Sequence, residues 1–227
     1  IFIEKNKLIN SNILKHASLR NIKNVLCFGS HTMYSPGQKK SEKYILENNT
    51  PSFIKGYADS KRSLLNECQN YCISGFNYKM LILPSIYGPF DLDAPPKQML
   101  NSIILRAIRS KQENKKTLDI RGDLNALREY IFLPDLADWI IKNIEFMDKL
   151  PVALNLGTNL MLPILEYYKI CSRLINIDLD FDKEVLNNYK GVSIEAPLDS
   201  SLALNFGWDV TTPMEEGIMR TIKYIEG

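Results

Sequence analysis

The spacing of hydrophobic and polar positions predicts a chain in which strands and helices alternate. Residues 25–28 and 78–83 are short apolar runs bounded by polar residues, as expected of buried strands. Between them, apolar residues recur at helical spacing over residues 57–74, and Gly75 follows as a helix cap. The order strand, helix, strand is typical of a parallel α/β unit.

The rest of the chain shows the same kind of pattern. Further helices are predicted at residues 3–18, 98–109, 133–146, 161–175 and 214–225. Further short strands are predicted at residues 118–120, 129–132 and 152–156. Residues 35–54 and 91–97 are rich in polar residues and proline, which favours irregular loops.

Composition excludes several classes of partner. The 227 residues are 45% hydrophobic and 24% charged, and a net charge of +2 creates no basic field for nucleic acid. No apolar run reaches the roughly 18 residues needed to span a bilayer. The 4 cysteines include no C-x-x-C pair, and with only 2 histidines a zinc site is not expected. We expect a cytoplasmic protein with buried thiols that binds neither nucleic acid nor a membrane.

The candidate chemistry lies at the first two predicted elements. Tyr57 and Lys61 are four residues apart, which places them on the same face of the predicted helix. A phenol with a pKa near ~10 gives up its proton more readily beside an ammonium, so this pair suits proton transfer. Ser30 follows the first predicted strand, where the reacting groups of parallel α/β folds gather. Each of these features alone is common on protein surfaces, and only their occurrence in this order indicates an active site.

Several short motifs occur in a fixed order along nearly the whole chain. They are the motifs at residues 29–34, 57–61, 84–89, 128–130, 134–137, 155–158 and 204–208. In this order they resemble the extended short-chain dehydrogenase/reductases, the NAD-dependent epimerase/dehydratase family, and within it the GDP-L-fucose synthases. The resemblance implies a Rossmann-like, doubly wound parallel sheet and a small C-terminal α+β lobe that binds substrate.

The resemblance also implies a division of the chain. Residues 1–90 would form the C-terminal half of the dinucleotide-binding domain, and residues 91–227 mainly the substrate lobe, with residues 129–158 returning to the first domain. The sequence contains no G-x-x-G-x-x-G loop. The N-terminal half with that loop is therefore expected to precede residue 1, so that this chain would be a truncated form or one piece of a split protein. A homodimer is expected as well.

Roles for individual residues follow from the resemblance. Ser30 would polarise a sugar carbonyl, Tyr57 would donate the proton, and Lys61 would assist Tyr57 and hold the ribose of NADP or NAD. The cofactor-binding residues would be Gly29, Tyr57, Lys61, Pro84, Ser85 and Ile86. A nucleotide-sugar substrate would contact Thr32, Arg106 and Arg128, and no metal is expected.

Two departures from the pattern bear on the reaction. Thr32 stands where the epimerase/reductases carry a catalytic cysteine. Lys97, Gln98 and Met99 stand where they carry a histidine. The expected activity is an NAD(P)-dependent 4-reductase or epimerase/reductase for a nucleotide-linked 4-keto-6-deoxy sugar. The alternative is a non-catalytic relative, or an inert fragment, that lacks the glycine loop.

Overall fold

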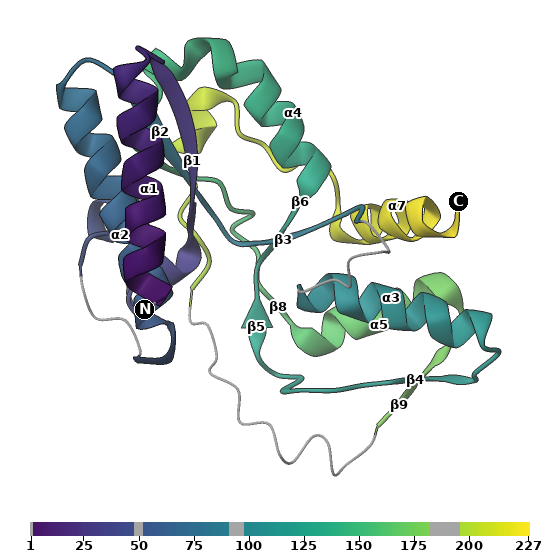
Figure 1. Ribbon diagram of the computed structural model, residues 1–227. Coiled ribbons are helices and arrows are strands. Elements are labelled where there is room, and N and C mark those ends of the chain that lie inside the picture. The colour runs from purple at the N-terminus through teal and green to yellow at the C-terminus, as the bar shows by residue number, and fades with distance from the viewer. Residues whose placement is uncertain (1, 48–51, 91–97, 182–195) are drawn as a thin grey trace. The chain divides into compact units, whose positions relative to one another are not determined.

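The computed structural model describes residues 2–47, 52–90, 98–181 and 196–227, which fold into two compact units (Figure 1). Unit 1 consists of Ile1–Pro84, Asp138–Asn159 and Glu195–Asp209. Unit 2 consists of Ser85–Ala137, Leu160–Ile194 and Val210–Gly227. The loop expected at residues 91–97 lies outside the described residues.

Unit 1 is built on a parallel sheet of three strands. Its order is β1 (Asn24–Ser30), β2 (Asn77–Leu83), β7 (Ala153–Asn155). Helices α1 (Phe2–Leu19) and α2 (Ser52–Ile73) lie side by side, and α2 also packs on β1 and β2 (Figure 1). The strand and helix order confirms the predicted α/β class with a parallel sheet.

The register of this sheet brings the carboxyl ends of β1 and β2 together. Ser30 pairs with Leu83, so the residues after both strands begin at the same edge. Strand β2 is buried from Tyr78 to Leu83, which explains why its residues are apolar except for Lys79. Helix α2 ends before Gly75, whose φ of +85° suits a residue without a side chain.

The predicted irregular loop at residues 35–54 is described at residues 35–47 and 52–54. Residues 35–47 are mostly irregular, as expected, apart from the short 3-10 helix η2 (Glu42–Tyr44). The prediction was wrong at its end, because α2 already begins at Ser52. The carboxylate of Glu42 accepts a hydrogen bond from the backbone N–H of Asn155, 2.9 Å away on β7.

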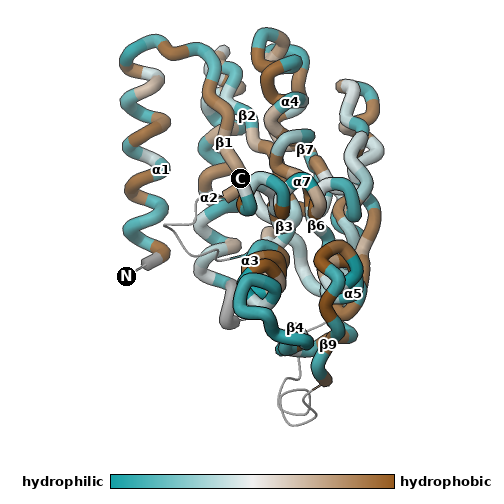
Figure 2. Tube along the Cα trace, turned by 90° about the vertical axis from the view of Figure 1, so that its right-hand side faces the viewer, coloured by the Kyte–Doolittle hydropathy of each residue, from teal (hydrophilic) through white to brown (hydrophobic). Residues whose placement is uncertain are grey.

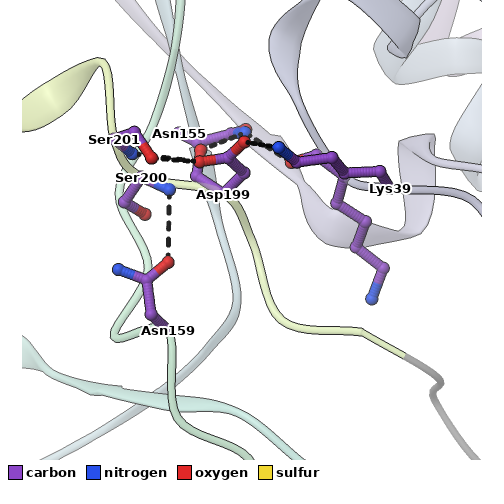
Figure 3. A network of polar contacts seen from close by, with 7 residues as sticks. Lys39, Asn155, Asn159, Asp199, Ser200 and Ser201 are labelled. Carbon is purple, nitrogen blue, oxygen red and sulfur yellow. Dashed lines mark hydrogen bonds and ion pairs between the residues drawn. The ribbon is translucent and has the colours of Figure 1, made fainter.

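A network of polar side chains ties the segment at residues 199–201 to the rest of unit 1 (Figure 3). The carboxylate of Asp199 pairs with Lys39 at 2.9 Å and accepts hydrogen bonds from the backbone N–H and the hydroxyl of Ser201. These bonds, the hydroxyl of Ser201 first, lower the pKa of Asp199 to about 2. The Asn155 amide donates to the carbonyl of the same Asp199, at 3.1 Å.

Unit 2 has its own hydrophobic core between three helices. These are α3 (Met99–Gln112), α5 (Ile164–Ile175) and α7 (Met214–Glu226), which contact one another through buried aliphatic and aromatic residues. In Figure 2, hydrophobic and hydrophilic positions alternate along these helices, as the sequence pattern requires of helices with one buried face.

The described part of unit 2 also contains three pairs of short strands. The parallel pairs are β3 (Ser85–Tyr87) with β6 (Tyr130–Phe132), and β4 (Thr117–Asp119) with β9 (Asp178–Asp180); the antiparallel pair is β5 (Leu127–Arg128) with β8 (Leu162–Pro163). The sequence pattern predicted β4 and β6 but not β3, β5, β8 or β9, because strands of two or three residues carry too few positions for a reliable period.

The helix predicted at residues 133–146 ends early. Helix α4 covers Leu133–Asn143, and the 3-10 helix η3 (Ile144–Lys149) follows it. Within η3, Phe146 departs from helical geometry, with φ of −111° and ψ of 23°. A last 3-10 helix, η4, covers Ala203–Phe206 in unit 1. Among the helices of the described residues, none is both long and apolar enough to cross a bilayer.

Candidate active site

The hydroxyl of Ser30 lies at the carboxyl end of β1 and caps the next turn. Ser30 is the N-cap of the 3-10 helix η1 (His31–Met33), and its Oγ accepts a hydrogen bond from the backbone N–H of Thr32 at 3.3 Å. The hydroxyl of Thr32 also donates to Ser30 Oγ, at 3.0 Å. Two hydroxyl groups therefore meet where β1 ends.

Tyr57 and Lys61 lie one turn apart on α2, as the spacing predicted. The Lys61 ammonium lies 5.8 Å from the centre of the Tyr57 ring. It also donates a hydrogen bond to the carbonyl of Phe28, 2.8 Å away on β1, and thereby ties α2 to the strand that ends in Ser30. Partial burial lowers the pKa of Lys61, and the charge of the nearby Cys27 acts in the opposite direction.

Arg62 is a second link between α2 and the segment after Ser30, and the sequence did not reveal it. Its side chain is buried, pairs with Asp59 at 3.1 Å, and donates to the carbonyl oxygens of Met33 and Ile45. A charged residue beside Lys61 reads as a surface position in the sequence. Only its burial shows that it holds the turn bearing Thr32 against α2.

The other residues expected at the cofactor fall in two places. Gly29 is buried in β1, and a Cβ there would come 2.9 Å from the sulfur of Met80 and 3.0 Å from that of Met33. Pro84 is buried at the end of β2 in unit 1. Ser85 and Ile86 begin unit 2, in β3, where both are half-buried.

Arg106 and Arg128, the residues expected at the substrate's phosphates, lie on different elements of unit 2. Arg106 on α3 donates to the carbonyl of Asp119 at 2.9 Å and to the hydroxyl of Tyr168. Arg128 on β5 donates to the carbonyl of Leu127 at 2.7 Å. An open pocket of about 160 Å³ brings Arg106, but not Arg128, together with further charged side chains. Its lining consists of Arg106, Arg109, Ser110, Glu113, Lys115, Leu118, Asp119 and Arg121.

Three of those cations, Arg109, Lys115 and Arg121, were not among the expected site residues. The pocket also contains the carboxylates of Glu113 and Asp119, which pair with Lys115 at 2.7 Å and with Arg121 at 3.8 Å. These ion pairs neutralise part of the positive charge of the pocket. The spacing of these residues along the sequence does not distinguish them from charged residues at the solvated end of an ordinary helix.

Comparison with known proteins identifies the family. Residues 1–157 match the sequence profile of the NAD dependent epimerase/dehydratase family. The chain belongs to this family. The resemblance noted in the sequence motifs is thereby confirmed, and the Ser30, Tyr57 and Lys61 positions lie within the matched residues.

Two known proteins are identical to this chain at about one residue in three over the matched part. GDP-L-colitose synthase of Yersinia pseudotuberculosis is 31% identical over 229 residues, which is 98% of this chain and 73% of that protein. GDP-L-fucose synthase of Azorhizobium caulinodans is 32% identical over 172 residues, which is 75% of this chain. The matched part spans 54% of the Azorhizobium protein.

Solved structures share the fold across the chain. The GDP-mannoheptose C4 reductase from Campylobacter jejuni with NADP bound superposes with a TM-score of 0.83 at 23% identity, covering 100% of this chain and 75% of that one. A GDP-L-fucose synthetase from Naegleria fowleri bound to NADP gives 0.81 at 17% identity, over 97% of this chain and 71% of that one. These likenesses confirm the Rossmann-like class.

Proposed function

We propose that this chain forms part of an NADP- or NAD-dependent reductase that acts on the 4-keto group of a GDP-linked 4-keto-6-deoxy sugar. The observation that carries the proposal is the hydrogen bond from Lys61 to the carbonyl of Phe28, because it joins the Tyr57 helix to the strand that ends in Ser30. The names of the relatives support the substrate class, since those proteins are described as GDP-L-colitose and GDP-L-fucose synthases.

The residues present fit a nicotinamide cofactor. Tyr57 is 42% exposed, so the residue is accessible to a ligand. Lys61 has three N–H donors and uses one of them on Phe28, so the ammonium is held at the site while it can bind a ribose hydroxyl. When bound, the cofactor supplies the hydride. We assign Gly29 and Pro84 of unit 1 to its binding surface. The cofactor roles expected for Ser85 and Ile86 from the resemblance stay predictions.

The residues of the chain would perform the proton chemistry. Ser30 donates a hydrogen bond to the carbonyl oxygen, which makes the carbon more electrophilic and stabilises charge on the oxygen. Tyr57 gives its proton to that oxygen as the carbonyl becomes an alcohol, and Lys61 stabilises the phenolate that remains. Arg106 and Arg128 suit the diphosphate, because a guanidinium binds phosphate oxygens through paired donors.

We propose that the reaction is reduction without epimerisation. Thr32 has a hydroxyl that barely ionises near neutral pH, so it does not abstract a proton from carbon. The positions of the family's histidine hold Lys97, Gln98 and Met99, so that histidine is missing. In D₂O, with NADPH and GDP-4-keto-6-deoxymannose, the full-length protein should form the 4-hydroxy product with no deuterium at C3 or C5, as read by NMR and mass spectrometry. Solvent deuterium at either carbon would show epimerisation instead.

The non-catalytic alternative is tested by the same assay and by calorimetry. If the full-length protein oxidises no NADPH with a GDP- or dTDP-linked 4-keto-6-deoxy sugar, and binds neither NADPH nor NADH, the reductase proposal fails. Binding of NADPH without turnover of either sugar would retain the cofactor site and reject the substrate class.

We further propose a homodimer in the cytoplasm. The four cysteines are free thiols, which suits a reducing compartment. Helix α1 buries Leu14 and Ala17 on its inner face, while Leu8, Ile9 and Ile13 are 62%, 54% and 58% exposed. Such an apolar stripe suits contact with a second copy. Leu8→Glu should therefore shift the mass measured by light scattering from dimer to monomer, and an unchanged dimer would contradict the role of α1.

A further inference from the structure

The hydroxyl of Ser30 accepts two hydrogen bonds, and both come from Thr32. A serine hydroxyl carries one proton to donate and two lone pairs that accept. Thr32 supplies two donors to Ser30 Oγ, its backbone N–H at 3.3 Å and its own hydroxyl at 3.0 Å. With both lone pairs engaged, the remaining hydrogen-bonding capacity of Ser30 is the donation of its proton.

We propose that Thr32 is a positioning residue that sets the Ser30 hydroxyl as a donor to the substrate's carbonyl oxygen. This inference rests on the proposed reductase function. It assigns Thr32 a role through Ser30, in addition to the substrate contact expected from the sequence. The chain of donors runs from the Thr32 hydroxyl to Ser30 Oγ, and from the Ser30 hydroxyl to the carbonyl oxygen.

The chemistry of the reaction favours this direction. A ketone oxygen only accepts hydrogen bonds, and it gains negative charge as the carbonyl is reduced. A hydroxyl that itself accepts a hydrogen bond becomes a stronger donor, because aligned hydrogen bonds polarise one another. Thr32 therefore strengthens the donor that Ser30 offers when charge develops, and this effect is larger in the transition state than in the ground state.

The surrounding backbone holds the two hydroxyls in this arrangement. Ser30 is the last residue of β1 and the N-cap of η1, so its own position is set by the sheet. Met33, next to Thr32, is fully buried, and its carbonyl accepts a hydrogen bond from the buried guanidinium of Arg62. The turn is thus fixed from the strand side and from the side of α2, which is the preorganisation that such a donor needs.

The test uses Thr32→Val, Thr32→Ser and Ser30→Ala in the full-length protein, with NADPH and a GDP-linked 4-keto sugar. Valine matches the shape of threonine, keeps the backbone N–H and removes the hydroxyl. We expect Thr32→Val to lower kcat about tenfold with KM for NADPH unchanged, and Thr32→Ser to retain kcat within about threefold, since one hydrogen bond is lost and then restored. If Thr32 acted only through packing, the smaller serine would not restore kcat.

The double variant separates action through Ser30 from an independent effect. If Thr32 acts through Ser30, adding Thr32→Val to Ser30→Ala should lower kcat no further. Additive losses, an unchanged kcat in Thr32→Val, or a Thr32→Ser variant as slow as Thr32→Val would each overturn the inference while the reductase proposal stands. A wild-type protein without turnover would overturn both.

Discussion

Replacing Tyr57 with phenylalanine should lower kcat for keto-sugar reduction about 1,000-fold, because the change removes the proton donor from the reaction. The side chain is 42% exposed, so the loss of one oxygen atom removes little packing and the variant should fold normally. Lys61 keeps its bond to Phe28, so NADPH should still bind. Stopped-flow oxidation of NADPH gives the rate, and calorimetry gives the affinity for the cofactor.

A matched control for this variant is Tyr224→Phe. Tyr224 lies on α7 and is 64% exposed, so it loses the same atom from a comparable surface position. Its turnover should equal that of the wild type. If Tyr57→Phe retains more than about a tenth of the wild-type kcat, Tyr57 is not the proton donor, and a solvent molecule or another group must serve that role.

The second large effect is expected on stability, from Asn155→Ala. The Asn155 side chain is fully buried, accepts a hydrogen bond from the Tyr34 hydroxyl at 2.8 Å, and donates to the carbonyls of Lys40 and Asp199 at 2.8 and 3.1 Å. Alanine leaves these buried partners unsatisfied. We expect the free energy of unfolding to fall by about 3 kcal/mol, which corresponds to a loss of about 10 °C in Tm.

The control for Asn155→Ala is Asn66→Ala, at an exposed position of α2. It removes the same amide from the surface and should change the free energy of unfolding by less than about 0.5 kcal/mol. Urea unfolding followed by circular dichroism measures both variants. Equal stability of the two would mean that the network around Asn155 in Figure 3 adds nothing to the fold.

The local part of the site could be predicted from the sequence. The four-residue spacing of Tyr57 and Lys61 places them together on any α-helix, whatever surrounds it. Ser30 follows an apolar run that predicts a strand, and β1 indeed ends at this residue. The expected burial of residues 25–28 was wrong, because Val25, Leu26 and Cys27 are half-buried and Phe28 is exposed. These features depend only on residues that are close together in the sequence. The periodic pattern of hydrophobic residues is therefore enough to predict them.

The contacts between distant segments could not be predicted. Arg62 looks like one more surface charge in the sequence, but the fold buries it against the carbonyls of Met33 and Ile45. Asn155 was only the first residue of a short motif, although it joins residues 34, 40 and 199. Such roles depend on which loops meet in space, and no spacing along the chain encodes that.

The sequence by itself determined that the protein has a parallel α/β fold, that Tyr57 and Lys61 share one helix face, and that the chain belongs among the NAD dependent epimerases and dehydratases. Only the tertiary structure decided what Ser30 does with its hydroxyl. The strand end, the turn of η1 and the buried Arg62 together bring the Thr32 hydroxyl to 3.0 Å from Ser30 Oγ. The reason is physical: whether two hydrogen-bonding groups come within bonding distance is set by their three-dimensional placement, not by their order along the chain.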